Sequence, residues 1–366
     1  MQIIPLFEKI LRFKSLTPDD DGAFAFIASY LPDFEVIELD KGGVKNRLFY
    51  KKYSEGEHLC FAGHIDVVPP GDVWDGDPFE PRHEDGYIYA RGAQDMKSGL
   101  SAFLKAVGDT KDFKGTLSLL LTSDEEGDAT YGTVIMLEHL KSIGFLPDYA
   151  IVAEPTCEVR FGDAIKIGRR GSINGVIEKM GRQGHAAYPQ KAKNPIHIVS
   201  QVLPHMAGVN LDEGDADFAP SQFVITDIRA GMEVTNVTPG KLKMMFNVRN
   251  STKTNQETIT AFVDKYFQGM DYTLVLNQSA KPFVTDRNSK IVQVMSQVIQ
   301  DIVDIRPKLS TAGGTSDARF FGEFGIDTVE FGVINDTIHA PNERTSIKEV
   351  EDLARVFARV IEKFSV

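Results

Sequence analysis

The sequence predicts an α/β fold in which a mostly parallel central sheet, covered by helices, is interrupted by a smaller inserted α+β domain. Three observations support this prediction. Short apolar runs alternate with helix-length amphipathic runs towards both ends of the chain, as in proteins built from βα units. The middle of the chain instead has the texture of antiparallel strands and two helices. The 366 residues exceed the size at which one hydrophobic core stops growing, so two domains are expected.

The first part of the chain contains three runs that we expect to form buried strands ending in polar residues. They are LCFAGHID from Leu59, TLSLLLTSDEE from Thr116 and YAIVAEP from Tyr149. Between them, KSGLSAFLKAV and TVIMLEHLKSIG have helical spacing, and Gly144 ends the second helix. Strands that alternate with helices predict a largely parallel sheet, in which ligands bind beyond the carboxyl ends of the strands.

The texture changes at about Gly171. The expected elements there are strands in GSINGVIEKM, SQFVITDIRA, KLKMMFNVRN and YTLVLN, and helices from Pro195 and Asn255. KPFVTD then leads into the amphipathic run IVQVMSQVIQDIVD, and the βα alternation resumes. We therefore predict a discontinuous catalytic domain of residues 1–170 and 284–366, with an inserted dimerisation or lid domain of residues 171–283.

Composition excludes several classes of protein. A net charge of −12 argues against a nucleic-acid binder, which would need a basic face. The two cysteines, Cys60 and Cys157, suggest neither a disulfide framework nor a thiolate metal site. The N-terminus is amphipathic and charged, unlike a signal peptide, and no stretch approaches a membrane span. We expect a cytoplasmic protein that acts on a small molecule and binds neither nucleic acid nor membrane.

Polar residues gather where the predicted strands end and in the loops that follow. These residues carry carboxylate or imidazole groups, and they are His64, Asp66, Asp95, Glu125, Glu126, Glu154 and His339. A lone glutamate at a strand end is usually a solvated side chain. Crowded carboxylates repel one another, however, and a divalent cation with nitrogen and oxygen ligands resolves the repulsion.

The spacing of these residues suggests a division of roles. His64 and Asp66 are two apart, so on an extended strand both face the same side, and Asp66 could accept a hydrogen bond from the imidazole. Glu125 and Glu126 are adjacent, so one can bind metal while the other faces the substrate as a proton carrier. The spacing alone does not say which glutamate does which.

The segments around these residues resemble, in order and over nearly the whole length, a family of dinuclear zinc metallopeptidases and deacylases. This family contains desuccinylases, acetylornithine deacetylases, aminoacylases and carboxypeptidases. The segments are GHIDVVPPGD, RGAQDMKSG, TSDEEG, EPT, GRRGSINGVI, GHAAYP, AGGTSDARF and VEFGVINDTIHAPNE. The resemblance implies a zinc-peptidase-like fold for the catalytic domain.

The resemblance also implies a metal centre of two zinc ions per subunit, which cobalt can replace. His64 and Glu154 would hold one ion, Glu126 and His339 would hold the other, and Asp95 would bridge them.

Proton transfer is assigned by the same resemblance. Glu125 would be the general base and acid, and Asp66 would be the orienting carboxylate. A nonproline cis peptide bond is expected between Asp95 and Met96.

Substrate binding is expected to involve arginines, because guanidinium can hold a carboxylate bidentately. By resemblance, the residues that contact the substrate's carboxylates and amide are Arg169, Arg249, Thr315 and Asn335, joined by Asn236 of the partner subunit. His185 of the partner subunit would reach the reacting carbonyl. The resemblance therefore implies a homodimer.

Within the family, GRRGS, GHAAYP and GGTSD are most similar to the desuccinylases, although Ala312 and Ala318 stand where those members tend to have glycine. The implied reaction is hydrolysis of N-succinyl-LL-2,6-diaminopimelate to succinate and LL-2,6-diaminopimelate, a step of lysine biosynthesis. The alternatives are a sibling amidohydrolase, such as an acetylornithine deacetylase or an aminoacylase, and a metal-free binding protein. The complete set of candidate ligands disfavours the binding protein, since a decayed site would be expected to lack at least one.

Overall fold

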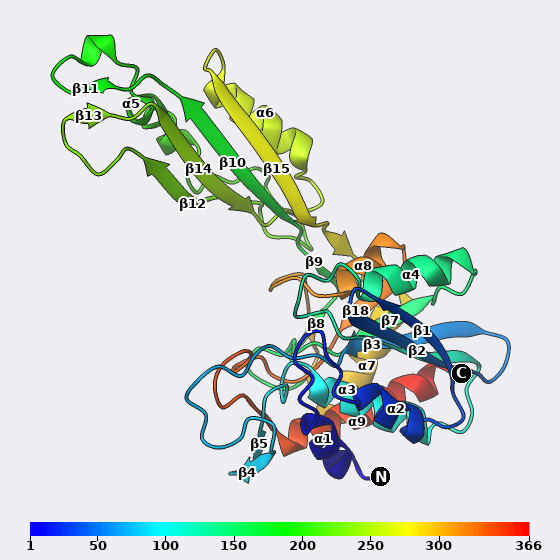
Figure 1. The fold of residues 1–366 in the computed structure, drawn as a ribbon. Helices are drawn as coiled ribbons and strands as arrows, with labels where there is room; N and C mark the ends of the chain where they lie inside the picture. The colour runs from blue at the N-terminus through cyan, green and yellow to red at the C-terminus, as the bar shows by residue number, and fades with distance from the viewer. Residues whose placement is uncertain (366) are drawn as a thin grey trace. The chain divides into compact units, whose positions relative to one another are not determined.

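The structure is a computed structural model that describes residues 1–365, and it divides the chain into two compact units (Figure 1). The first unit contains Met1–Gly168, Val284–Ser310 and Ser316–Val366, and the second contains Arg169–Phe283 and Thr311–Thr315. Strands β9 (Gly168–Arg169) and β16 (Phe283–Val284) lie where the chain passes from one unit to the other.

The segment Thr311–Thr315 differs from the sequence prediction, which placed it in the catalytic domain. Its contacts within the second unit explain the difference. Thr311 Oγ1 donates a hydrogen bond to the Asp217 carbonyl (2.5 Å), and Arg169 Nη1 donates to the Ala312 carbonyl (3.2 Å). These hydrogen bonds join residues far apart in sequence, so no local pattern could reveal them.

The first unit is built on a central sheet in the spatial order β1-β2-β6-β3-β7-β18-β8-β17. The strands are β1 (Glu35–Lys41), β2 (Val44–Lys52), β3 (Glu57–His64), β6 (Gly115–Thr122), β7 (Tyr149–Val152), β8 (Ala164–Lys166), β17 (Lys308–Ser310) and β18 (Asp327–Glu330). Strands β6, β3, β7 and β18 run parallel to one another, as do β8 and β17. Strands β1 and β2 add an antiparallel edge, and β8 pairs antiparallel with β18. The predicted mostly parallel sheet is confirmed.

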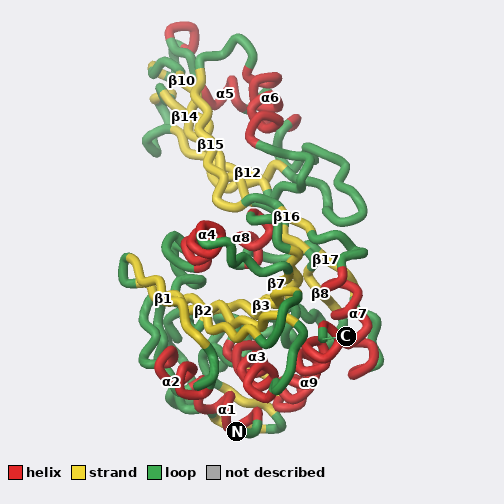
Figure 2. Tube along the Cα trace, turned by 90° about the vertical axis from the view of Figure 1, so that its right-hand side faces the viewer, coloured by secondary structure: helices red, strands yellow, loops and turns green. Residues whose placement is uncertain are grey.

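Helices cover both faces of this sheet. They are α1 (Ile3–Leu11), α2 (Ala23–Tyr30), α3 (Lys97–Asp109), α4 (Thr133–Ser142), α7 (Lys290–Val303), α8 (Ala318–Glu323) and α9 (Ile347–Phe364). Figure 2 shows α3 and α9 on one face and α4 and α8 on the opposite face. Every residue of β6 is buried, as expected for a parallel strand between two helical layers. The same unit contains a small sheet of β4 (Arg82–Glu84), β5 (Tyr87–Tyr89) and β19 (Arg344–Ser346).

The second unit is built on an antiparallel sheet in the order β12-β14-β10-β15. Its strands and helices are β10 (Ser172–Met180), β12 (Phe223–Ala230), β14 (Lys241–Val248), β15 (Tyr272–Ala280), α5 (Pro195–Val199), α6 (Gln256–Phe267), η1 (Pro189–Lys191) and η2 (Leu203–His205). The unit also contains a short antiparallel pair, β11 (Gly184–His185) and β13 (Val237–Thr238). Asn255 caps α6, because its side chain accepts from the Thr258 N–H at 2.9 Å while the Thr258 hydroxyl accepts from the Asn255 N–H.

Along the part of the chain that the structure describes, no helix combines the length and apolar character needed to cross a membrane.

Candidate metal centre

Three parallel strands deliver acidic and histidine side chains to one edge of the central sheet. β3 ends at His64, which is in register with Thr122 at the end of β6. The turn after β6 contains Glu125 and Glu126. β7 ends at Val152, and Glu154 follows directly. Parallel strands place their carboxyl ends at the same edge, so these side chains meet there.

Asp95 lies between two histidines. Its Oδ1 is 3.2 Å from His64 Nε2, and its Oδ2 is 3.4 Å from His339 Nε2. Glu154 Oε1 is 3.8 Å from His64 Nε2, and Glu126 Oε1 is 3.0 Å from His339 Nε2. The contacts form two pairs that share one carboxylate, which is an arrangement suited to two neighbouring cations. The peptide bond that follows Asp95 is cis, as expected.

Glu125 lies close to the same ligand atoms. The ligand atoms of His64, Asp95 and Glu126 lie within 4.8 Å of one another, and so do those of His64, Glu125 and Glu154. Glu125 is therefore near enough to act on a substrate at the centre, and it is also near enough to serve as a ligand.

Asp66 contacts the site differently from the sequence prediction. The backbone carbonyl of Asp66, not its carboxylate, is the hydrogen-bond partner of His64 Nδ1, at 2.8 Å. The carboxylate Oδ1 is 3.6 Å from the same nitrogen. β3 ends at His64, so the two-residue alternation of a strand does not extend to Asp66. The carboxylate instead accepts from Thr17 Oγ1 (2.7 Å) and from the backbone N–H groups of Glu125 (3.4 Å) and Glu126 (3.2 Å).

The electrostatics of the centre favour added positive charge. Burial alone would lower the pKa of His64, but its hydrogen bond with Asp95 and the charge of Asp66 raise that pKa well above its usual value. Hydrogen bonds to Asp95 and Glu126 raise the pKa of His339 to about 10. Burial would raise the pKa of Asp95, yet the two imidazoles lower it. A divalent cation bound among these carboxylates would supply positive charge in the same place.

The remaining carboxylates of the centre are destabilised as anions. Burial raises the pKa of Glu154 well above its usual range, and the charges of Asp95 and Glu125 add to the effect. Burial likewise raises the pKa of Glu125. Glu154 Oε1 is buried without a hydrogen-bond partner among the described residues, so an acceptor remains available. Two imidazoles, crowded carboxylates and an unused oxygen fit divalent cations with nitrogen and oxygen ligands.

Asn335 is the predicted substrate residue that the first unit contains. Its side-chain amide donates to the Pro155 carbonyl at 3.3 Å, and its backbone N–H donates to the Cys157 carbonyl at 2.9 Å. Asn335 therefore lies beside the segment that carries Glu154. Its side chain is exposed.

The other predicted substrate residues and His185 lie in the second unit. Arg169 is buried and contacts the segment that contains Thr315 through the Ala312 carbonyl. Arg249 is exposed and directly follows β14. The Ala186 N–H donates to the Asn236 carbonyl at 2.9 Å, so the exposed His185 and Asn236 lie close together at the pair of β11 and β13.

Three residues near the centre received no role from the sequence. Asp317 is buried, and its charge contributes to the raised pKa of Glu125. Arg91 and Glu343 form a buried ion pair of 2.7 Å. All three stand in segments quoted for the family resemblance, RGAQDM, GGTSD and HAPNE, which is the signal that could have found them.

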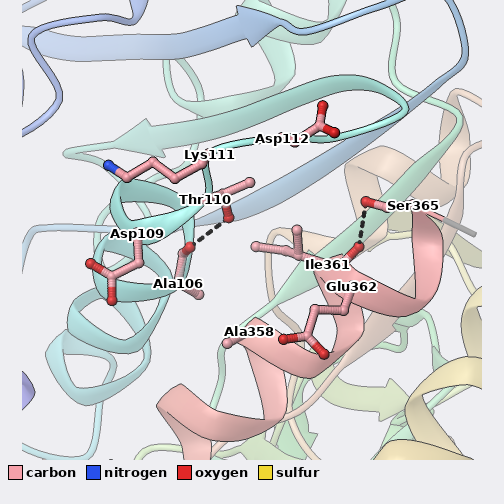
Figure 3. Close-up of a pocket in the computed structure, with 9 residues that line it drawn as sticks. All are labelled: Ala106, Asp109, Thr110, Lys111, Asp112, Ala358, Ile361, Glu362 and Ser365. Carbon is pink, nitrogen blue, oxygen red and sulfur yellow. Dashed lines mark hydrogen bonds between the residues drawn. The ribbon is translucent and has the colours of Figure 1, made fainter.

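A cavity of about 390 Å³ lies elsewhere in the first unit, between the carboxyl ends of α3 and α9 (Figure 3). Its hydroxyl groups bind backbone carbonyls, since Thr110 donates to Ala106 and Ser365 donates to Ile361. Asp109 pairs with Lys105. The residues that line it include none of the predicted site residues.

Comparison with known proteins agrees with the sequence resemblance. A family model described as peptidase family M20/M25/M40 matches residues 60–363. A succinyl-diaminopimelate desuccinylase of a Nitratiruptor species is 69% identical over 364 residues, and the alignment covers 100% of both chains.

Solved structures share the fold. The aminopeptidase PepT of Bacillus cereus superposes with a TM-score of 0.82 at 20% identity, covering 100% of this chain and 98% of that one. A dinuclear metal-binding peptidase of the M20 family from Bacillus subtilis superposes with a TM-score of 0.72 at 13% identity, covering 99% of this chain and 97% of that one. At such identities the likeness concerns the fold alone.

Proposed function

Because the chain belongs to peptidase family M20/M25/M40, we propose that it is a metal-dependent amidohydrolase that removes the succinyl group from N-succinyl-LL-2,6-diaminopimelate. The products are succinate and LL-2,6-diaminopimelate. The observation that carries the proposal is the 69% identity to a succinyl-diaminopimelate desuccinylase over the whole chain. The metal centre supports it, since the side chains that the resemblance implies as ligands lie close together at the end of the sheet.

The proposed metal ligands follow the contacts at the centre. His64 and Glu154 would hold one ion, Glu126 and His339 would hold the other, and Asp95 would be a ligand of both. When bound, such ions lower the pKa of water and polarise the amide carbonyl. We propose zinc as the resident metal, with cobalt as a functional substitute.

Glu125 is the proposed proton carrier. Its carboxylate accepts a proton from the attacking water while the oxygen of that water bonds to the amide carbon. As the bond between carbon and nitrogen breaks, Glu125 returns the proton to the leaving nitrogen, so the products are a carboxylic acid and an amine. Asp66 holds the backbone N–H groups of Glu125 and Glu126, which supports a positioning role for Asp66.

Substrate recognition is proposed for the residues that the family resemblance implies. Arg169 and Arg249 would bind carboxylates of the substrate, assisted by Thr315, Asn335 and Asn236. His185 of the partner subunit would donate a hydrogen bond to the carbonyl oxygen as negative charge develops on it. This assignment requires a homodimer. We also propose that the enzyme acts in the cytoplasm.

The test is a parallel turnover assay. The purified enzyme is supplied with N-succinyl-LL-2,6-diaminopimelate, N-acetylornithine or an N-acetylated apolar amino acid, and released amine is measured. We expect the highest kcat/KM for the succinylated substrate, loss of activity with a chelator, and recovery with zinc or cobalt. Preference for an acetylated substrate would identify a sibling amidohydrolase, and full activity in metal-free protein would disprove the metal mechanism.

A further inference from the structure

Glu343 is a buried carboxylate that binds the segment carrying Asp95. Its side chain is 1% exposed, and Oε2 accepts from Arg91 Nη1 at 2.7 Å. Oε2 also accepts from the Gly92 N–H at 2.9 Å. Oε1 accepts from the N–H groups of Gln94 at 2.7 Å and Asp95 at 3.0 Å. Both oxygens of one carboxylate therefore hold the backbone that leads to the proposed bridging ligand.

Arg91 extends this arrangement to the loop of His339. Its Nη2 donates to the His339 carbonyl at 3.4 Å and to the Pro70 carbonyl at 3.2 Å. The ring of Trp74 lies 5.2 Å from the guanidinium carbon. His339 has a φ of 60°, a left-handed conformation that is uncommon for a residue with a side chain. A donor on its carbonyl helps to hold that conformation.

Gln94 adds a second connection between the same two loops. Its side-chain oxygen accepts from the Thr337 N–H at 2.8 Å, and its amide donates to the Asp336 carboxylate. The Asp95 segment and the His339 loop are thus joined by contacts that do not involve the side chains of the proposed ligands. Their relative position is set independently of any ion.

We propose that Glu343 and Arg91 are positioning residues for the metal centre, and that they support the ion at Glu126 and His339 more than the ion at His64 and Glu154. The inference rests on the proposed function, because it requires two bound ions. Breaking the pair would loosen the backbone of Asp95, which is the proposed ligand of both ions. It would also loosen the loop of His339, which is the proposed ligand of only one of them.

The ligands of the other ion are anchored differently. His64 is the last residue of β3, and its Nδ1 contacts the Asp66 carbonyl. Glu154 follows β7, which pairs with β3 along the sheet. Neither ligand depends on Arg91 or Glu343 for its own backbone position, so we expect the two ions to respond unequally.

Two variants test the proposal. Glu343→Gln replaces one acceptor oxygen by an NH2 group, which faces backbone N–H donors that it cannot satisfy. Arg91→Lys keeps the charge but loses the second nitrogen of the fork that reaches the His339 carbonyl, and it disturbs the fold less. The control is Asp212→Asn, which replaces a carboxylate of the second unit by an amide. The Asp212 carboxylate likewise accepts hydrogen bonds from backbone N–H groups (Gly214 at 2.7 Å, Ser221 at 3.2 Å).

The measurement is the number of zinc ions retained per chain when the zinc-loaded enzyme is equilibrated with a chelator over a range of free zinc. We expect one ion of Glu343→Gln to need about 10–100-fold more free zinc than in the wild type, the usual effect of losing a group that orients a metal ligand. The free zinc needed to retain the other ion should change less, and Asp212→Asn should retain zinc as the wild type does. A His339→Ala protein should keep the ion at His64 and Glu154. Introducing Glu343→Gln into it should lower the affinity for that ion less than Glu343→Gln alone lowers the affinity for the ion at Glu126 and His339.

Three results decide the inference. Equal weakening of both ions, or zinc retention no different from that of Asp212→Asn, would overturn it even if the wild type binds two ions and hydrolyses substrate. An undiminished effect of Glu343→Gln in the His339→Ala protein would also overturn it. A wild-type protein that holds no zinc and shows no hydrolysis would instead contradict the proposed function itself.

Discussion

Replacing Glu125 by glutamine separates proton transfer from metal binding. Glutamine has nearly the same shape as glutamate, but its amide cannot accept and return a proton near neutral pH. The backbone of residue 125 should stay in place, because the Asp66 carboxylate binds the N–H groups of residues 125 and 126 whatever their side chains are. The change therefore removes one chemical capacity and little else.

The expected magnitude follows from the role. General acid–base catalysis is typically worth about 10²–10⁴-fold, which corresponds to about 3–5 kcal/mol of activation free energy. We expect kcat of Glu125→Gln to fall by that amount while both ions remain bound. The matched variant is Glu126→Gln, in which the 3.0 Å contact with His339 Nε2 loses its negative charge. That variant should lose affinity for one ion.

The assay measures steady-state turnover of the succinylated substrate and zinc content in the same preparations. The reasoning would be refuted if Glu125→Gln lost zinc and kept its activity per occupied site. In that case Glu125, which lies within 4.8 Å of the His64 and Glu154 ligand atoms, would be a ligand, and Glu126 would carry the proton.

Three further predictions concern substrate, subunits and stability. Arg249→Lys keeps the charge but removes the bidentate fork, so we expect weaker use of the succinylated substrate with unchanged zinc content, and unaltered kinetics would mean that the carboxylate pocket lies elsewhere. His185→Ala and Glu125→Gln homodimers should each be nearly inactive, since an oxyanion donor is typically worth about 10²–10³-fold in kcat, but subunit exchange between them should restore one active site. No recovery despite verified exchange would show that His185 serves its own chain or does no chemistry. Burial lowers the pKa of His58 to about 4, so at acidic pH the unfolded chain binds a proton more readily than the folded protein does. The stability that neutral His58 provides is complete above its unfolded pKa of about 6.5, and it is lost as the pH falls through that value towards 4. Chemical denaturation should show a loss of about 2 kcal/mol between pH 7 and pH 5 that His58→Gln lacks, and an identical pH dependence in both proteins would refute the assignment.

The sequence could predict the central strands and the residues at their ends because both carry local signals. An apolar run such as that of β6 indicates a strand buried on both faces, and acids and histidines directly after such runs are chemically conspicuous. The antiparallel edge formed by β1 and β2 was not predicted. Both strands mix charged and apolar residues, and most residues of β1 are exposed. The prediction that the Asp66 carboxylate accepts a hydrogen bond from His64 was wrong in detail. It assumed that alternate residues face the same side, which holds only within a strand, and β3 ends at His64.

The residues that the sequence prediction missed cannot be recognised by their side-chain type, unlike those that it found. A metal ligand must have one of a few side chains, so its type marks it wherever it stands. Arg91 and Glu343 are 252 positions apart, and each alone resembles an ordinary charged residue. Their importance follows from burial, because a carboxylate removed from water requires donors for its oxygens, and here those donors are the backbone of the Asp95 segment and one guanidinium. Side-chain chemistry therefore indicates where ions would bind, whereas the hydrogen bonds that hold the ligands in place depend on the fold, which brings distant loops together.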